Sequence, residues 1–354
     1  MNALQQRIAD LIAVQGPISI AQYMTLALHD PKDGYYATRD PFGAGGDFTT
    51  APEISQMFGE MLGLWCVQVW HDQGRPEPVR LVELGPGRGT LMADALRAMR
   101  VVPEFLSALD VVLVEASPVL RDMQQAKLAD CGANLAWTDR FDATSIDRTL
   151  FLIANEFFDA LPIRQFVRVG TGWRERMVTA SADGQLSFVL APVAGDALVP
   201  AERNGAPQGG VTEIAPAATA LTEEIARTIV QHGGGALIVD YGYGAPGYGE
   251  TLQAVESHSF ADVLADPGES DLSAHVDFLA LAEAVRRGGA APWGPAGQGP
   301  FLRDLGITVR AERLIQNDPA VAAALDRLIN PQQMGTLFKA LAIVAEDAPK
   351  PPGF

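Results

Sequence analysis

The chain of 354 residues has few of the residues that mark disulfide-rich or metal-binding proteins. Its two cysteines, Cys66 and Cys131, lie far apart and form no CxxC pattern, so neither a disulfide framework nor a zinc site is expected. Its five histidines form no HExxH pattern, which is the helical zinc motif of metalloproteases. We therefore expect no metal in this protein.

Long apolar runs are also missing from the sequence. No run of roughly eighteen apolar residues occurs, so no transmembrane helix is expected. Residues 1–10 show no basic region followed by an apolar run, so no secretory signal is visible. These two observations lead us to expect a cytoplasmic protein.

Basic side chains are scarce, because 26 Lys and Arg stand against 43 Asp and Glu, for a formal net charge of -17. General binding to nucleic acid depends on cationic side chains and is therefore not expected. The charge favours cationic partners, or it simply provides a well-solvated surface. Hydrophobic residues make up 48%, enough for a sizeable core, and the length indicates one large domain with insertions or two domains.

From residue 79 onward, short apolar runs alternate with helical patterns. Buried strands are expected at 79–84, 110–115, 150–155 and 235–241, and a helix at 90–100. Strands that alternate with helices in this way imply a parallel sheet covered by helices on both faces. The expected fold class is therefore α/β.

The remaining segments divide the chain further. We expect an N-terminal helical and loop region over 1–75 and a core over 76–347. Within the core, the alternation is interrupted at 163–230 and at 242–305, which we interpret as insertions that build the substrate side. The Pro-rich tail, 348–354, is expected to be flexible.

Three local patterns complete the prediction of structure. Residues 165–178 resemble a β-hairpin around Gly170-Thr171-Gly172. Ile307 to Arg310 is expected to return to the sheet as a strand. Thr50 and Glu53 fit a capping box, in which each side chain bonds an amide at the start of a helix.

A glycine-rich turn follows the strand at 79–84. Gly85, Gly87 and Gly89 form a GxGxG pattern between a strand and a helix, where backbone amides approach a nucleotide closely. The dinucleotide fingerprint GxGxxG needs a third glycine where Thr90 stands, and no GxxxxGK[ST] pattern is present. This spacing, with Glu83 directly before the turn, favours S-adenosylmethionine. The alternative is an ordinary tight turn.

A second acidic residue ends the next strand. Glu115 lies at a position where a carboxylate accepts hydrogen bonds from both hydroxyls of a ribose. Such a bond serves any adenosine-containing cofactor and does not by itself exclude NAD. Together with the turn it predicts a cofactor site made by Glu83, the three glycines and Glu115.

Several blocks resemble the MidA-like family of class I methyltransferases, which includes the mitochondrial complex I assembly methyltransferase. The blocks occur in the family's order over about residues 18 to 310, and the second and fourth are the most specific. They are Asp30-Pro31 with Gly34-Tyr35-Tyr36, Gly46-Asp47-Phe48-Thr49-Thr50-Ala51-Pro52-Glu53-Ile54-Ser55, Glu83 to Gly89, Ala154-Asn155-Glu156-Phe157-Phe158-Asp159-Ala160-Leu161-Pro162, Asp271 to Phe278, and Gln298-Gly299-Pro300-Phe301-Leu302.

The resemblance implies a Rossmann-like, mostly parallel sheet of about seven strands, as in class I methyltransferases, with an added helical region. It implies S-adenosyl-L-methionine as cofactor and methyl transfer as the reaction. The mitochondrial member is associated with symmetric dimethylation of an arginine in a complex I subunit, so a protein substrate, with a respiratory complex I subunit as candidate, is implied here. Two alternatives stay open, namely a small-molecule methyltransferase and an assembly factor that binds the cofactor without catalysis.

Polar residues after the strand at 150–155 are the candidate catalytic groups. An arginine acceptor is always protonated, so carboxylates must orient it and ease the loss of its proton. Glu156 and Asp159 are the candidates, with Asn155 beside them. The alternatives are that Glu156 is only solvated and that Asp159 only caps a helix.

Five other residues are weaker candidates. Asp47 and Thr49 lie in a glycine-rich loop that we expect to close over the cofactor, or to form a structural turn. Tyr241 and Tyr243 follow a predicted strand and are candidates for the substrate wall or for packing. His275 is a candidate general base, but a local hydrogen-bonding role at a helix start is the more common one.

Overall fold

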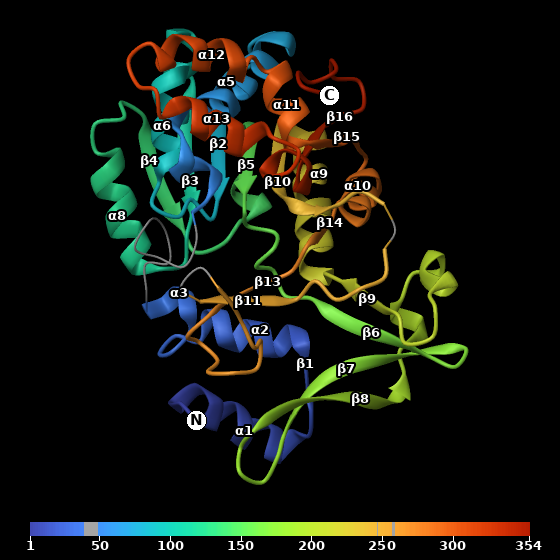
Figure 1. Ribbon diagram of the computed structural model, residues 1–354. Helices are drawn as coiled ribbons and strands as arrows, with labels where there is room; N and C mark the ends of the chain where they lie inside the picture. Colours follow the sequence, from blue (N-terminus) through green and yellow to red (C-terminus); the bar gives the residue numbers. More distant parts are fainter. Residues whose placement is uncertain (39–48, 246, 257–258) are drawn as a thin grey trace. The chain divides into compact units, whose positions relative to one another are not determined.

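The computed structural model describes residues 1–38, 49–245, 247–256 and 259–354 (Figure 1). The chain forms two compact units, each assembled from three stretches of sequence. The sheet unit comprises Thr49–Phe158, Thr219–Gly244 and Phe278–Phe354, and the N-terminal unit comprises Met1–Phe48, Asp159–Ala218 and Ala245–Asp277.

The sheet unit alternates strands and helices in its first part and ends in a group of helices. Its strands are β2 (Val79–Leu84), β3 (Leu109–Val114), β4 (Asn134–Thr138), β5 (Thr149–Asn155), β10 (Gly234–Tyr243), β15 (Ala290–Gly297) and β16 (Phe338–Ala345). Its helices are α4 (Ala51–Ile54), α5 (Gln56–Asp72), α6 (Thr90–Met99), α7 (Pro103–Ser107), α8 (Pro118–Leu128), η1 (Ala143–Ser145), most of α9 (Pro216–His232), α10 (Phe278–Arg287), α11 (Gln298–Asp304), α12 (Ile307–Ile315), α13 (Val321–Ile329) and α14 (Met334–Leu337).

These strands form one sheet in the order β15-β16-β10-β5-β2-β3-β4. Neighbours from β4 to β10 run parallel, and β16 runs antiparallel to both β10 and β15. Every residue of β5 is buried, as expected for a strand between two parallel neighbours with helices over both faces. The predicted α/β fold with a mostly parallel, seven-strand sheet is confirmed.

Helix α5 belongs to the sheet unit, so the unit begins at Thr49 and not at residue 76 as expected. Ser55 caps α5 through a 3.2 Å bond from the Met57 amide. A Cβ atom at Gly63 would lie 2.8 Å from Ala95 Cα, so the two helices α5 and α6 approach each other at backbone distance there. The apolar face of α5 joins the core beneath the sheet, which explains why the boundary lies earlier.

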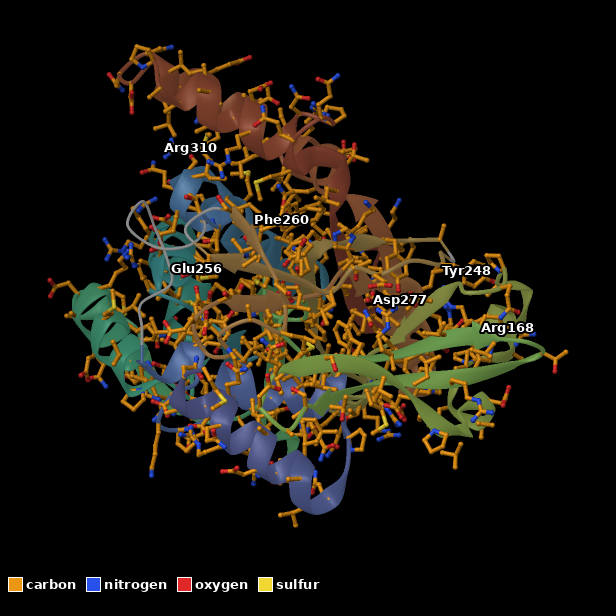
Figure 2. All side chains as sticks on the ribbon, turned by 60° about the horizontal axis from the view of Figure 1, so that its bottom comes forward. Arg168, Tyr248, Glu256, Phe260, Asp277 and Arg310 are labelled. Carbon is orange, nitrogen blue, oxygen red and sulfur yellow. The ribbon has the colours of Figure 1, made fainter. Side chains whose placement is uncertain are left out.

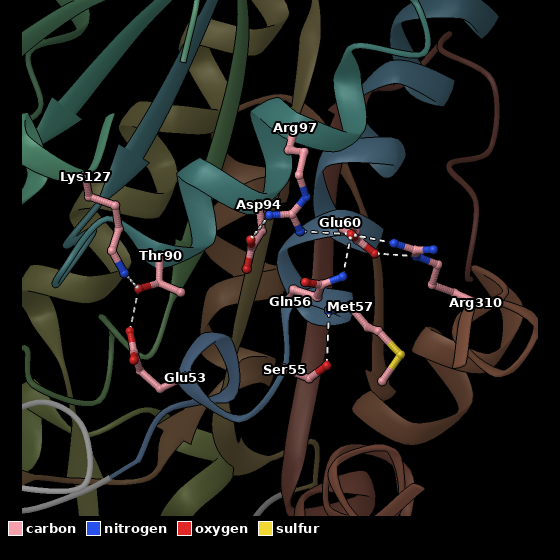
Figure 3. Close-up of polar contacts among 10 residues, drawn as sticks. All are labelled: Glu53, Ser55, Gln56, Met57, Glu60, Thr90, Asp94, Arg97, Lys127 and Arg310. Carbon is pink, nitrogen blue, oxygen red and sulfur yellow. Dashed lines mark hydrogen bonds and ion pairs between the residues drawn. The ribbon is translucent and has the colours of Figure 1, made fainter. Parts of the chain in front are cut away.

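Residues 307–310, expected as a strand, form the first turn of α12 instead. Ile307 and Ala311 are buried one helical turn apart, and Arg310 reaches the buried Glu60 of α5 with bonds of 2.7 and 2.9 Å (Figure 3). Arg97 of α6 also bonds Glu60, at 2.9 Å. These tertiary contacts override the β-propensity of the Ile-Thr-Val run.

The Pro-rich tail also differs from expectation, because it packs against the sheet unit. The Trp65 indole donates a hydrogen bond of 3.2 Å to the Pro352 carbonyl. The ring of Phe354 lies 5.2 Å from that of Phe301, centroid to centroid, and Pro351 is buried. Aromatic contacts of this kind order a terminus that composition alone marks as frayed.

The N-terminal unit combines helices with two small antiparallel sheets. Its helices are α1 (Ala3–Gln15), α2 (Ile20–His29), α3 (Tyr35–Thr38), η2 (Asp196–Leu198) and η3 (Ala201–Gly205). Its strands are β1 (Ile18–Ser19), β6 (Arg164–Val169), β7 (Gly172–Ala180), β8 (Leu186–Ala194), β9 (Val211–Ile214), β11 (Gln253–Glu256), β12 (Ser259–Ala261), β13 (Asp271–Ser273) and β14 (Val276–Asp277).

The larger sheet of this unit contains the predicted hairpin, which is confirmed as β6 and β7 in antiparallel register. Arg168 lies near the end of the hairpin, with its guanidinium carbon 5.4 Å from the centre of the Trp173 ring (Figure 2). Its sheet follows the order β1-β7-β6-β9, with β8 paired to β7. Within the described residues, no helix is long and apolar enough to span a membrane.

Candidate functional site

The glycine turn after β2 forms one wall of the candidate site. Gly85, Gly87 and Gly89 have φ angles of 61°, 53° and 78°, all in the left-handed region that side chains disfavour. The Gly85 amide donates to the Val114 carbonyl at 3.0 Å, and Gly89 forms the N-cap of α6. The backbone conformation therefore favours glycine at all three positions, and the turn brings the main chain to the carboxyl ends of β2 and β3.

Glu83 lies on β2 just before this turn and is only 3% exposed. Its Oε2 atom accepts no hydrogen bond from the residues that the structure describes. Burial, and secondarily repulsion from Glu115, raise the pKa of Glu83 to about 8. A buried carboxyl oxygen without a hydrogen-bond donor is costly, so Glu83 Oε2 is suited to meet a cationic or hydrogen-donating group of a ligand.

Glu115 follows the end of β3 and is held by donors of α8. Its Oε1 accepts the Ser117 amide at 2.8 Å, and its Oε2 accepts the Gln124 side chain at 3.3 Å. Burial raises the pKa of Glu115, while these two bonds oppose the shift. The carboxylate is thus fixed at the end of its strand, where a ribose would be bound.

Sequence reasoning missed Gln124, which connects both parts of this site. Its amide nitrogen donates to the Gly87 carbonyl at 2.7 Å as well as to Glu115, and its oxygen accepts from the Trp137 indole at 2.9 Å. Gln124 is fully buried on α8. A glutamine spaced four residues from Leu120 and from Leu128, on the buried face of that helix, was the available signal.

The candidate catalytic residues Asn155 and Glu156 lie at the end of β5, the strand beside β2. Glu156 Oε1 accepts the Ala51 amide at 2.9 Å and the Asn155 side chain at 3.2 Å. Asn155 is buried, and its Oδ1 accepts no hydrogen bond among the described residues. Glu156 is therefore not merely solvated, because it bonds the first residue of α4.

Thr90, the first residue of α6, is bonded to Glu53 of α4 and to Lys127 of α8 (Figure 3). Thr50 is the N-cap of α4, but its side chain makes no capping bond, so the predicted capping box does not form. Glu53 instead accepts a hydrogen bond of 2.5 Å from the Thr90 hydroxyl, which also accepts one of 2.5 Å from Lys127. The Glu53 amide, which a capping box would direct to the Thr50 side chain, donates to the Thr50 backbone carbonyl at 3.0 Å instead, and the Ala51 amide donates to the carboxylate of Glu156.

The other predicted residues are distributed as follows. Asp47 lies outside the described residues, and Thr49 is half-buried in the sheet unit. Asp159 belongs to the N-terminal unit, where it is buried and its carbonyl accepts the Ala274 amide at 2.9 Å.

The weaker candidates make ordinary contacts. The ring of Tyr241 packs edge-on against Phe338 at 5.4 Å, and Tyr243 is half-buried. The amide of His275 donates to the Thr251 hydroxyl at 2.9 Å in the N-terminal unit. Among the described residues, no cluster of His, Cys, Asp and Glu is arranged to hold a metal ion.

The sheet unit fits S-adenosyl-L-methionine. Left-handed glycines allow the backbone to approach a ligand, and the fixed Glu115 carboxylate suits a ribose. Glu83 and Asn155 each hold a buried acceptor atom that meets no donor in the described chain. The cofactor's ammonium group is a donor, and its sulfonium is a cation that would favour the ionised form of Glu83.

The strand order, the glycine turn and the strand-end acids together define a class I S-adenosyl-L-methionine-dependent methyltransferase. Residues 61–296 match the family described as "Putative S-adenosyl-L-methionine-dependent methyltransferase". This match covers about two thirds of the sequence, and the chain belongs to this family.

Known relatives agree with this assignment. The chain is 36% identical to a Xenopus laevis protein and 37% identical to a human one, both named protein arginine methyltransferase NDUFAF7, mitochondrial. These alignments cover 97% and 93% of this chain, and 84% and 80% of the relatives. A Burkholderia thailandensis structure bound to S-adenosyl-homocysteine shares 29% identity, with a TM-score of 0.86, over 99% of this chain and 94% of that one.

The relatives correct one expectation. The missing secretory pattern led us to expect a cytoplasmic protein, whereas the curated relatives are named mitochondrial. That inference was wrong because the absence of a secretory signal concerns only the secretory route. Mitochondrial targeting depends on a different kind of segment, which that test does not address.

Proposed function

We propose that this methyltransferase acts on an arginine side chain of a protein partner. The observation that carries the proposal is the name of its relatives, protein arginine methyltransferase, at 36–37% identity over nearly the whole chain. The cofactor supplies an activated methyl group when bound, and the chain must bring a nucleophile into line with it. The acidic surplus of the chain is compatible with a cationic acceptor.

Glu156 is proposed to orient the guanidinium of the acceptor. A guanidinium is always protonated, and its planar fork matches a carboxylate through paired, charge-assisted hydrogen bonds. The bonds from Ala51 and Asn155 to Glu156 Oε1 hold this carboxylate in one orientation. Preorganised in this way, it would favour the position from which the acceptor nitrogen attacks and would ease the loss of its proton.

Asn155 is proposed as a supporting residue in the same step, because it neighbours Glu156 and donates to its carboxylate. Asp159, a buried acid of the N-terminal unit, stays a candidate on its sequence position alone. The segments 163–230 and 242–305 are proposed to take part in binding the acceptor protein. Protection of these segments from hydrogen exchange when an acceptor peptide is added would support this role, and unchanged exchange would contradict it.

The direct test of the function uses labelled S-adenosyl-L-methionine. The purified protein is incubated with a mitochondrial extract and, separately, with isolated complex I subunits, which the family resemblance makes candidate substrates. Mapping a labelled arginine in a protein would support the proposal. Label recovered only in small molecules would favour a small-molecule methyltransferase, and cofactor binding without transfer would favour an assembly factor.

The variant Glu156→Gln tests the role of the carboxylate. Glutamine keeps an oxygen that accepts the Ala51 amide, so the start of α4 is preserved while the charge is lost. We expect turnover to fall by about ten- to a hundredfold, the value of a charge-assisted bond made in the transition state. Cofactor affinity should stay nearly unchanged. If affinity falls together with turnover, Glu156 serves the cofactor site instead.

A further inference from the structure

Asp240 ends the buried part of β10 and has a fully buried side chain. Its Oδ2 atom accepts two backbone amides from the segment after β5, Phe157 at 3.2 Å and Phe158 at 3.0 Å. Its Oδ1 accepts the Tyr241 amide at 2.9 Å. A carboxylate can be buried when its oxygens accept hydrogen bonds. Here two of the three donors are backbone amides of the turn that follows the neighbouring strand β5.

The turn held by Asp240 contains backbone strain. Glu156 has a φ angle of 48°, in the left-handed region that residues other than glycine rarely occupy. Its amide donates to the Val239 carbonyl at 3.0 Å, so β10 holds the turn at a second point. Such a conformation persists only where surrounding contacts over-determine it. The two amides bonded to Asp240 directly follow Glu156 and supply that constraint.

The same turn contacts the cofactor side of the unit at two places. The Phe157 ring lies against Gly85, since a Cβ atom built there would be 2.8 Å from Phe157 Cδ2. The Glu156 carboxylate bonds the amide of Ala51 at the start of α4. One strained turn therefore supports both the first glycine of the cofactor turn and the helix that follows residue 50.

We propose that Asp240 is a positioning residue for cofactor binding. By holding the amides of Phe157 and Phe158, it keeps Glu156 left-handed, and so keeps the Phe157 ring on Gly85 and the Glu156 carboxylate on Ala51. Asp240 acts through this turn and not through the ligand. The proposal rests on the cofactor binding that the family establishes and is independent of the proposed arginine acceptor.

The test compares Asp240→Asn with the unaltered protein in two measurements that need no acceptor. Asparagine keeps the size of the side chain, but its one acceptor oxygen cannot serve the Phe157 and Phe158 amides and the Tyr241 amide together, so its NH₂ group meets a donor on one side. Calorimetry should show S-adenosyl-L-methionine bound about tenfold more weakly, as expected for one lost bond to a buried group. Hydrogen exchange at the amides of Ala51, Phe157 and Phe158 should accelerate by at least about tenfold relative to amides of β16.

Two further variants separate positioning from general destabilisation. Leu341→Ala opens a cavity in β16, next to β10, and should lower Tm at least as much while changing neither cofactor affinity nor the relative exchange at Ala51. Asp240→Glu keeps the carboxyl group but moves it by one methylene, and should reproduce both changes. If Asp240→Asn misfolds, Asp240→Glu carries the test.

Either of two results would overturn the proposal. One is normal cofactor affinity and normal exchange at Ala51 in a folded Asp240 variant. The other is an equal loss of both in Leu341→Ala, because Asp240 would then contribute only to stability.

Discussion

Two turns of the sheet unit solve the same backbone problem with different residues. The turn after β2 uses glycine at each of its left-handed positions, Gly85, Gly87 and Gly89. The turn after β5 places a charged residue, Glu156, in that conformation and holds it with Asp240 and with bonds to its own amide and carboxylate. The first turn is shaped by residue type, and the second by tertiary contacts.

This difference decides what the sequence reveals. A glycine pattern between a strand and a helix is visible in one segment of sequence, and it led to the cofactor site. A left-handed glutamate has no such pattern, because its partners Asp240 and Ala51 lie 84 residues after and 105 residues before it. The comparison predicts that adding a side chain to one of the glycines disrupts the first turn. The second turn should be disrupted by removing one of its distant partners.

The largest expected effect is that of Gly87→Val in the first turn. A branched side chain strains a left-handed backbone and fills the space that the cofactor must approach. We expect S-adenosyl-L-methionine to bind more than about a thousandfold more weakly in calorimetry, effectively below detection. Circular dichroism should confirm that the protein stays folded.

Gly132→Val is the matched control. Gly132 has a φ angle of 80°, and no heavy atom lies within 4 Å of a Cβ position there. Valine at this position therefore strains the backbone in the same way but does not belong to the cofactor turn. Its affinity should equal that of the unaltered protein. Normal binding by a folded Gly87→Val protein would show that the glycine turn is only structural.

The next effect is the pH dependence of cofactor affinity. Because burial raises the pKa of Glu83 to about 8, the free protein holds this carboxyl protonated at pH 7 and below. A bound sulfonium and ammonium favour the carboxylate and lower that pKa, so binding releases a proton. Affinity should therefore rise by about tenfold per pH unit toward pH 7.5, up to which the ligand's own amine stays mostly protonated.

Calorimetry in two buffers of different ionisation enthalpy measures the proton directly. Glu83→Gln removes the ionisation and should bind with little dependence on pH between about 5.5 and 7.5. A constant affinity of the unaltered protein over that range would mean that Glu83 does not face the cofactor.

Gln124→Met should lower cofactor affinity by a smaller amount, because Gln124 stabilises the first turn through a hydrogen bond to Gly87. Methionine has a similar size but leaves the Gly87 carbonyl and the Trp137 indole without their partner. We expect about tenfold weaker cofactor binding, from one or two lost bonds to buried groups. Gln68→Met, on the exposed face of α5, is the control and should not change affinity. Equal affinity in both variants would exclude Gln124 from the site.

Much of the fold followed from apolar periodicity, because strands such as β5 and β10 are continuous buried runs between helical patterns. Residues 307–310 show where this reasoning ends. Their β-branched side chains favour a strand, whereas the burial of Ile307 and Ala311 and the bonds from Arg310 to Glu60, 250 residues away, favour the helix. The tail at Phe354 was misjudged for the same reason, since its packing on Phe301 is a long-range contact in space.

The residues of the candidate site likewise differ in whether a local sequence pattern indicates them. Glu83 and Glu115 were accessible to sequence reasoning because each ends a predicted strand, where parallel sheets bind their ligands. Asp240 also lies near the end of a strand, β10, but its carboxylate accepts amides of another turn, and no local feature of the sequence shows that direction. Strand ends therefore identify candidates, and only the structure separates those facing a ligand from those that hold the backbone.

The smallest expected effect concerns the strain at Glu156, and two substitutions measure it. Glu156→Ala removes the bond to Ala51 and keeps a side chain in the left-handed region, so unfolding should become easier by about 1–2 kcal/mol. Glu156→Gly removes the same bond but also relieves the strain. The free energy of unfolding of Glu156→Gly should therefore be about 1 kcal/mol higher than that of Glu156→Ala, as measured by denaturant unfolding with equal m-values. Equal stability of the two variants would mean that the left-handed conformation at Glu156 costs no free energy. The two turns would then differ only in their residue types, and not in stored backbone strain.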